Sequence, residues 1–202
     1  MTIRLLLADD QELIRTALAA LLDLEDDFEV VAQVGRGDEV VAAAERERPD
    51  VALLDVEMPG LDGLAAAAVL TGRVPDCRVV ILTTFGRAGY LRRAMEAGAV
   101  GFVVKDAPAE ALADAIRRVA RGERVVDPAL AAATLAAGAS PLTARERDVL
   151  NASRSGASVA EIARKLFLSE GTVRNYLSAA IAKTGAQNRM EALRLADDRG
   201  WL

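Results

Sequence analysis

The sequence contains no histidine, and this absence removes several classes of active site. Nucleophile systems of the Ser-His-Asp or Cys-His kind need an imidazole base, and most zinc sites need an imidazole ligand. The chain also cannot carry a phosphohistidine of its own. Any acid-base or metal chemistry therefore has to rest on aspartate and glutamate side chains.

Cysteine and long apolar runs are also scarce. The single cysteine, Cys77, excludes an internal disulfide framework and fits a reducing cytosol. Cys77 precedes an apolar strand pattern, so we expect a packed thiol rather than a reactive one. No apolar run approaches the roughly 20 residues of a membrane-spanning helix, and the N-terminus lacks the layout of a signal peptide. We therefore expect a cytoplasmic protein.

Charge is distributed unevenly along the 202 residues. Residues 1–127 hold 15 Lys and Arg against 23 Asp and Glu, residues 128–140 hold no charged residue, and residues 141–202 hold 10 against 7. An acidic first part, an uncharged connector and a mildly basic last part predict two domains with different partners. We expect a first domain over 1–122, a linker over 123–140 and a second domain over 141–202.

Short runs rich in Val, Ile and Leu alternate with helix-length segments over the first 120 residues. Most runs are continuous rather than alternating, as expected of strands covered on both faces. Five βα units with right-handed crossovers predict an α/β domain on a five-stranded, doubly wound parallel sheet of the flavodoxin-like kind. The expected strands span residues 3–9, 28–35, 51–55, 78–84 and 101–105.

The last 60 residues indicate a small all-α domain. Thr143 with Glu146 and Ser158 with Glu161 form capping-box patterns, and Ser169 is a further N-cap candidate. A helix over 159–166, a short turn and a second helix over 170–183 have the layout of a helix-turn-helix, whose second helix enters the DNA major groove. The alternative is a generic four-helix bundle with a solvated face.

Polar residues stand at the ends of four of the five expected strands: Asp9 and Asp10, then Asp55, Thr83 and Lys105. Because parallel sheets place their sites at the carboxyl ends of the strands, we expect these side chains to converge. Three neighbouring carboxylates repel one another, and Mg²⁺ would relieve that conflict. A metal-bound carboxylate beside a lysine and a threonine suits an aspartyl-phosphate. Any one of these residues could also be ordinary; Asp10, for example, could simply cap the next helix.

The motifs "LLADD", "LLDVEMPGLDG", "ILTT" and "GFVVKDAP" give residues 1–122 a close resemblance to the receiver domain of two-component response regulators. The resemblance implies that Asp55 is the phosphoacceptor. It also implies that Asp10 and Asp55 bind Mg²⁺ directly, that Asp9 does so through water, and that the backbone carbonyl of Glu57 completes the metal site.

The same resemblance gives roles to three residues on the later strands. Thr83 would contact the phosphoryl oxygens and reorient on phosphorylation, and Lys105 would pair with the phosphate. Phe102 occupies the position of the family's aromatic switch residue, although a simple core phenylalanine is an equal alternative. Pro59 and Gly60 would shape the loop that leaves the phosphoacceptor accessible.

Residues 141–202 resemble the LuxR/NarL-type effector domain through "LTARERDVL", "EIARKLFLSEGTVRNYLS" and "EALRLA". Val173, Leu177 and Ile181 have the spacing of a buried helix face. The resemblance places Arg174, Asn175 and Ser178 at base-reading positions and Thr172 and Lys183 near the DNA backbone. One departure stands out, because the family has apolar residues where this chain has Ser153 and Arg154. We expect loose packing or exposure there.

Together the two parts resemble a NarL/FixJ-type transcriptional response regulator, and some segments resemble the branch that regulates fatty-acid desaturase. The resemblance implies a sensor histidine kinase as phosphodonor, a homodimer on phosphorylation and a double-stranded DNA promoter as target, with no membrane partner and no substrate turnover. Dimer contacts are expected from Leu18, Leu22, Ile116 and Val119, which could equally be core residues. Two alternatives are a phosphorylation-independent DNA binder with a vestigial receiver and a phosphotransferase of the aspartyl-phosphate type.

Overall fold

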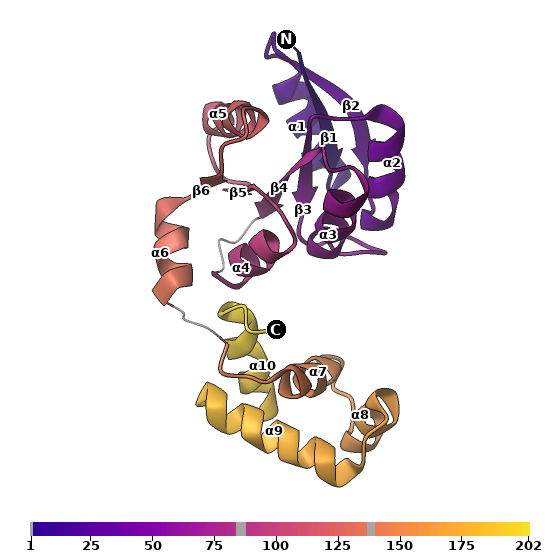
Figure 1. Cartoon of the computed structure of the whole chain (residues 1–202), viewed down its shortest axis with the longest axis vertical. Helices are drawn as coiled ribbons and strands as arrows, with labels where there is room; N and C mark the ends of the chain where they lie inside the picture. Colours follow the sequence, from indigo (N-terminus) through magenta and orange to yellow (C-terminus); the bar gives the residue numbers. More distant parts are fainter. Residues whose placement is uncertain (1, 84–87, 137–139) are drawn as a thin grey trace. The chain divides into compact units, whose positions relative to one another are not determined.

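The computed structural model describes residues 2–83, 88–136 and 140–202 (Figure 1). The chain divides into two compact units, the first comprising residues 1–86 and 90–131 and the second chiefly residues 132–202. Residue 84, the expected end of the fourth strand, and residues 137–139 of the expected linker lie outside the described residues. No described helix is both long enough and apolar enough to cross a bilayer.

The first unit is built on a parallel sheet with the strand order β2-β1-β3-β4-β5-β6. This is the doubly wound order, in which the direction of chain progression across the sheet reverses between β1 and β3. The five expected strands are present, and a sixth, very short strand was not predicted. The strands are β1 (Ile3–Ala8), β2 (Phe28–Val34), β3 (Val51–Asp55), β4 (Arg78–Thr83), β5 (Gly101–Val104) and β6 (Val125–Val126).

Helices cover both faces of this sheet. Leu5, Leu53 and Val80 pack with side chains of α1 and α5 in one apolar core. Leu6 and Leu54 pack with side chains of α2, α3 and α4 in the other. The continuous apolar runs in the sequence follow from this arrangement, because both faces of each central strand are buried. The helical elements are α1 (Glu12–Leu22), η1 (Gly37–Glu39), α2 (Val40–Glu47), α3 (Gly63–Arg73), α4 (Ala88–Glu96) and α5 (Ala109–Ala120).

Burial tests two predictions for this unit, one for the cysteine and one for the expected dimer contacts. Cys77 is buried, and burial raises the pKa of its thiol to about 12, so it is a packed thiol as expected. Leu22, Ile116 and Val119 are buried in the core formed with α1 and α5, which makes them core residues rather than dimer contacts. The large apolar side chains left exposed in and beside α1 are instead Leu13, Leu21 and Leu24.

The segment expected to be a linker contributes to the first unit. It supplies β6 and the start of α6 (Pro128–Ala136), whose Leu130 is buried in the core that also holds α2 and α3. The carboxylate of Asp127 accepts a hydrogen bond of 2.9 Å from the backbone N–H of Leu130 at the start of this helix. Leu142, only twelve residues further along, is buried in the core of the second unit.

The second unit consists of α7 (Ala144–Ala152), α8 (Val159–Leu166), α9 (Glu170–Thr184) and α10 (Arg189–Asp198). Both predicted capping boxes are formed, and Ser169 caps α9. The turn between α8 and α9 passes through Phe167, which has a positive φ of 55°. A short αL turn of this kind sets the angle between the two helices of a helix-turn-helix.

The expectation of loose packing or exposure after α7 is wrong for Ser153 and confirmed for Arg154, whose side chain is exposed. Ser153 is fully buried, and its hydroxyl donates a hydrogen bond of 2.6 Å to the carbonyl of Leu150. A serine replaces an apolar residue here at little cost, because its hydroxyl is satisfied by the preceding turn of its own helix. Arg154 makes a two-pronged ion pair with Asp197 and thereby ties the end of α7 to α10.

Candidate functional sites

Three side chains from separate strand ends meet at the carboxyl edge of the sheet. Asp9 follows β1, Asp55 ends β3 and Lys105 follows β5. The ammonium nitrogen of Lys105 lies 2.6 Å from Oδ2 of Asp9 and 3.0 Å from Oδ2 of Asp55. Carboxylate oxygens of Asp9, Asp10 and Asp55 all lie within 4.8 Å of one another. Asp9 and Asp55 are buried, whereas Asp10 is exposed.

Backbone hydrogen bonds hold these groups in place. The backbone N–H of Val56 donates to Oδ1 of Asp55 at 2.8 Å, and that of Gln11 donates to Oδ1 of Asp9 at 2.9 Å. In both carboxylates the second oxygen faces Lys105. The backbone N–H of Lys105 donates to the carbonyl of Thr83 at 2.7 Å, so the ends of β4 and β5 lie side by side. Thr83 itself is buried at this edge.

The loop after Asp55 approaches it closely. The backbone N–H of Gly63 donates to the carbonyl of Val56 at 2.9 Å, and a Cβ on Gly63 would lie 1.8 Å from the carbonyl oxygen of Asp55. Gly60 has a φ of +80°, a conformation that favours glycine. These two glycines allow the loop to turn back tightly onto the end of β3. The side chain of Glu57, in the same loop, is exposed.

Burial and charge set the ionisation of the cluster. Burial raises the pKa of Asp55, and the ammonium of Lys105 opposes this shift without cancelling it. Burial also acts to lower the pKa of Lys105, but the carboxylates of Asp9 and Asp55 outweigh it, so that its pKa is raised. Lys105 is therefore a firmly held cation, and Asp55 is a more basic carboxylate than an exposed aspartate.

The donor set fits a hard divalent cation. Three carboxylates beside one ammonium leave excess negative charge at this edge. Oδ2 of Asp9 and Nζ of Lys105 lie at ion-pair distance, yet neither atom makes a well-directed hydrogen bond within the part of the chain that the structure describes. A buried oxygen with an unused lone pair, next to two further carboxylates, is a suitable ligand set for Mg²⁺.

Phe102 is a residue of the hydrophobic core. Its ring is buried in the core that also holds side chains of α3 and α4. It is therefore packed as a core phenylalanine in this conformation. The switch position assigned by resemblance remains a prediction, because a switch residue would also need a second orientation.

The second candidate site is the exposed arc of α9. Arg174, Asn175 and Ser178 are exposed, and Thr172 is partly exposed. Val173 and Leu177 are buried on the opposite side, as expected, while Ile181 packs at the margin of the core. The hydroxyl of Thr172 lies 2.8 Å from that of Ser169 at the start of the helix. The arc thus presents polar groups that can contact base edges.

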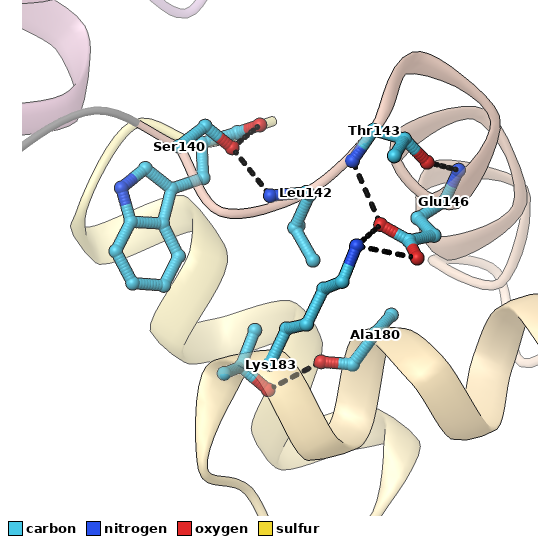
Figure 2. A network of polar contacts seen from close by, with 8 residues as sticks. Ser140, Leu142, Thr143, Glu146, Ala180 and Lys183 are labelled. Atoms are coloured by element: carbon cyan, nitrogen blue, oxygen red, sulfur yellow. Dashed lines mark hydrogen bonds and ion pairs between the residues drawn. The ribbon is translucent and has the colours of Figure 1, made fainter.

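Lys183 is engaged in a contact that the sequence did not predict (Figure 2). Its ammonium lies 2.8 Å from both carboxylate oxygens of Glu146, at the start of α7. Glu146 is buried and also accepts a hydrogen bond of 2.7 Å from the backbone N–H of Thr143. Burial acts to raise the pKa of Glu146, but Lys183 and Thr143 outweigh it and the pKa is lowered. Lys183 thus joins α9 to α7, with one N–H left for another partner.

Comparison with known protein families shows the family to which the chain belongs. The model "Response regulator receiver domain" matches residues 5–117, and the model "Bacterial regulatory proteins, luxR family" matches residues 140–196. The chain belongs to the response regulators. It combines a receiver domain with a LuxR-type DNA-binding domain and is a transcriptional regulator of that family.

Individual relatives support this over the full length. The chain is 43% identical to transcriptional regulatory protein DesR of Bacillus subtilis, over 98% of both chains. It is also 43% identical to the uncharacterized transcriptional regulatory protein YvfU of the same organism, over 99% of this chain and 100% of the relative. A similar solved structure is that of response regulator ChrA of a heme-sensing two-component system, with 34% identity and a TM-score of 0.60. Because the chain is equally identical to DesR and YvfU, sequence identity alone does not say which of these two relatives it resembles more.

Proposed function

We propose that Asp55 accepts a phosphoryl group and that the modification switches the protein into its DNA-binding dimer. The observation that carries this proposal is the pair of contacts from Lys105 to Asp9 and Asp55. They bring a cation and a nucleophilic carboxylate together at the carboxyl edge of the sheet. The donor would be a sensor histidine kinase, since this chain has no histidine. Both proteins would act in the cytoplasm.

The chemistry follows from the two oxygens of Asp55. Oδ1 is held by the N–H of Val56, which leaves Oδ2 as the attacking atom. Oδ2 forms a bond to phosphorus as the bond from phosphorus to the donor's imidazole nitrogen breaks, and the imidazole leaves with that electron pair. Lys105, already 3.0 Å from Oδ2, can then pair with the new phosphoryl oxygens. Thr83, at the end of the neighbouring strand, would turn its hydroxyl toward them.

Asp9, Asp10 and Asp55, with the backbone carbonyl of Glu57, would hold Mg²⁺. The metal would neutralise charge on the phosphoryl group during transfer. The exposure of Asp10 supports this assignment, because a metal that retains waters needs one side open to solvent.

Dimerisation would bring two α9 helices to neighbouring half-sites about one DNA turn apart. The exposed apolar side chains of Leu13, Leu21 and Leu24 support α1 as part of the dimer surface. On DNA, Arg174, Asn175 and Ser178 would contact bases, and Thr172 would contact the backbone. Lys183 could add a phosphate contact only through the N–H that Glu146 leaves free.

We also propose that the two domains are separated within the uncharged stretch 128–140, following a receiver over 1–122 and preceding a DNA-binding domain over 141–202. Support comes from the change of core between Leu130 and Leu142. The segment between 123 and Leu130 would then act as an extension of the receiver.

The test of the phosphoacceptor is acetyl-phosphate labelling followed by mass measurement of the intact protein. The wild-type chain should gain one phosphoryl group with Mg²⁺ present, and Asp55→Asn should gain none while keeping its circular dichroism spectrum. A full mass gain in the variant would move the acceptor to another residue. Equal DNA binding and equal oligomeric state with and without beryllofluoride would instead indicate a phosphorylation-independent regulator.

A further inference from the structure

Glu170 opens α9 and contacts one of the predicted base-reading residues. Its Oε2 lies 2.7 Å from a terminal guanidinium nitrogen of Arg174, one helical turn further along. Both side chains are exposed, Glu170 by 50% and Arg174 by 61%. The carboxylate therefore stands on the same exposed surface as the arc of α9 described above.

The contact between Glu170 and Arg174 contributes little to the stability of the fold. Exposed ion pairs between residues four apart contribute little to stability. The start of α9 is already capped by Ser169, whose hydroxyl oxygen accepts a hydrogen bond of 3.1 Å from the N–H of Thr172. On DNA the carboxylate would even be unfavourable, because it adds negative charge where the phosphates are dense.

The contact does, however, restrict Arg174. An arginine at this position can reach either a base edge in the groove or a phosphate at its rim. A carboxylate beside it holds the guanidinium over the start of the helix and disfavours the phosphate arrangement by repulsion. The guanidinium has five N–H donors, so it can keep its bond to Glu170 and still offer two to a guanine.

We propose that Glu170 is a specificity-determining residue that positions Arg174 for base contact at the expense of general DNA affinity. This inference rests on the proposed function, in which α9 reads the major groove through Arg174. It assigns Glu170 a positioning role, and it expects the loss of Glu170 to strengthen binding to unrelated DNA.

Two substitutions of Glu170 distinguish the effect of its negative charge from the effect of its reach toward Arg174. Glu170→Gln keeps the length of the side chain and removes its charge, whereas Glu170→Asp keeps the charge and shortens the reach. The full-length beryllofluoride-treated protein would be measured on sites selected from a random DNA library and on random DNA of equal length, at one salt concentration. A matched control is Asp148→Asn, which removes the same charge from another exposed ion pair, that with Arg145 on α7.

Glu170→Gln is expected to bind random DNA at least about threefold more tightly and to lose about fivefold or more of the ratio between selected and random DNA. Glu170→Asp should also lower the ratio between selected and random DNA, but its affinity for random DNA should stay at the wild-type value. In an Arg174→Ala background, Glu170→Gln should leave the ratio unchanged. The Asp148→Asn control should keep the wild-type ratio.

A ratio within twofold of wild type in Glu170→Gln, with only a lower melting temperature, would make Glu170 a helix-stabilising residue and overturn the inference. A further loss of ratio in the Arg174→Ala background would also overturn it, since Glu170 would then act independently. Failure of the proposed function has a different signature: the wild-type protein itself would not distinguish selected from random DNA.

Discussion

Lys183 reaches from α9 to the buried carboxylate of Glu146, with its ammonium 2.8 Å from both oxygens. Removing the ammonium leaves a buried carboxylate without its cation. We expect Lys183→Met to destabilise the DNA-binding domain by about 1–3 kcal/mol, less than for a fully buried pair because the Lys183 side chain remains 38% exposed. Trp201 is the only tryptophan and lies in this core, so its fluorescence reports unfolding in urea.

The control for Lys183→Met is Lys165→Met on α8, since Lys165 is exposed and no ion pair of it is found within the described ranges. Stability should change by less than about 0.5 kcal/mol in that variant. Equal losses in both variants would show that the effect comes from lost charge in general and not from the contact with Glu146.

Acid should weaken the same domain. The pKa of Glu146 is lowered in the folded protein, so its contribution is complete above the ordinary glutamate pKa and is lost as pH falls through the lowered value. We expect the urea midpoint reported by Trp201 to fall below about pH 4.5 in the wild type. Glu146→Gln should show a smaller decline over this range. A variant with the same slope as the wild type would assign the acid sensitivity to other carboxylates.

The sequence predicted the convergence of Asp9, Asp55 and Lys105 better than the contacts within the DNA-binding domain. Five apolar runs, most of them continuous, define the strands. Parallel pairing then brings the carboxyl ends of these strands, and with them Asp9, Asp55 and Lys105, to one edge of the sheet. The two-residue β6 was missed because so short a strand carries no periodic pattern. Its position depends on pairing with β5, which only the folded sheet supplies.

The missed contacts have a common cause. Lys183 and Glu146 are 37 residues apart, and Arg154 and Asp197 are 43 apart. No local pattern marks which distant charges will meet, so neither ion pair was predicted from the sequence. Ser153 was misjudged for a different reason: a serine hydroxyl bonded within its own helix can be buried as readily as a small apolar group.

Lys105→Ala should separate the effect of the ammonium charge on stability from its effect on phosphorylation at the proposed phosphoacceptor site. Without the ammonium, the buried carboxylates of Asp9 and Asp55 repel each other, so the receiver should lose stability in the absence of metal. Mg²⁺ should restore more stability to the variant than to the wild type, as measured by calorimetry. Phosphorylation by acetyl phosphate should slow on the order of 100-fold. A variant phosphorylated at the wild-type rate would remove Lys105 from the transfer step.

Asp10→Asn should weaken metal affinity without destabilising the fold. Asp10 is exposed and, unlike Asp9, has no ion pair with Lys105, so loss of its charge only relieves repulsion and the apo protein should keep or raise its melting temperature. Loss of one carboxylate should raise the Mg²⁺ concentration for half-maximal phosphorylation by roughly tenfold or more. Chelation by EDTA should abolish labelling of both proteins. The control is Asp106→Asn, a neighbour of Lys105 outside the carboxylate cluster; an equal shift there would point to general electrostatics.

Leu13 and Leu24 offer a test of the proposed dimer surface, because they are 83% and 79% exposed. Leu13→Gln with Leu24→Gln should change stability by less than about 0.5 kcal/mol per site. The beryllofluoride-bound dimer should nevertheless dissociate at concentrations at least about tenfold higher, as measured by sedimentation. Val69→Gln, an exposed apolar residue on α3, is the matched control. Undiminished dimerisation of the double variant would move the interface to another face.

Two glycines of α3 should respond to alanine in opposite ways. A Cβ on Gly63 would lie 1.8 Å from the carbonyl oxygen of Asp55, whereas nothing lies within 4 Å of a Cβ on Gly72. Gly72→Ala should therefore stabilise the receiver by up to about 1 kcal/mol, since alanine favours helical backbone more than glycine does and Gly72 lies in the last turn of α3.

Gly63→Ala should instead destabilise the receiver by about 1–3 kcal/mol, because backbone has to move to admit the methyl group. The displaced backbone is that of Asp55, so phosphorylation should also slow, while Gly72→Ala should label at the wild-type rate. Urea unfolding followed by circular dichroism and acetyl-phosphate labelling would measure both effects. If Gly63→Ala lost stability but labelled normally, the close approach of this loop would serve packing and leave the position of the Asp55 carboxylate to Val56 and Lys105.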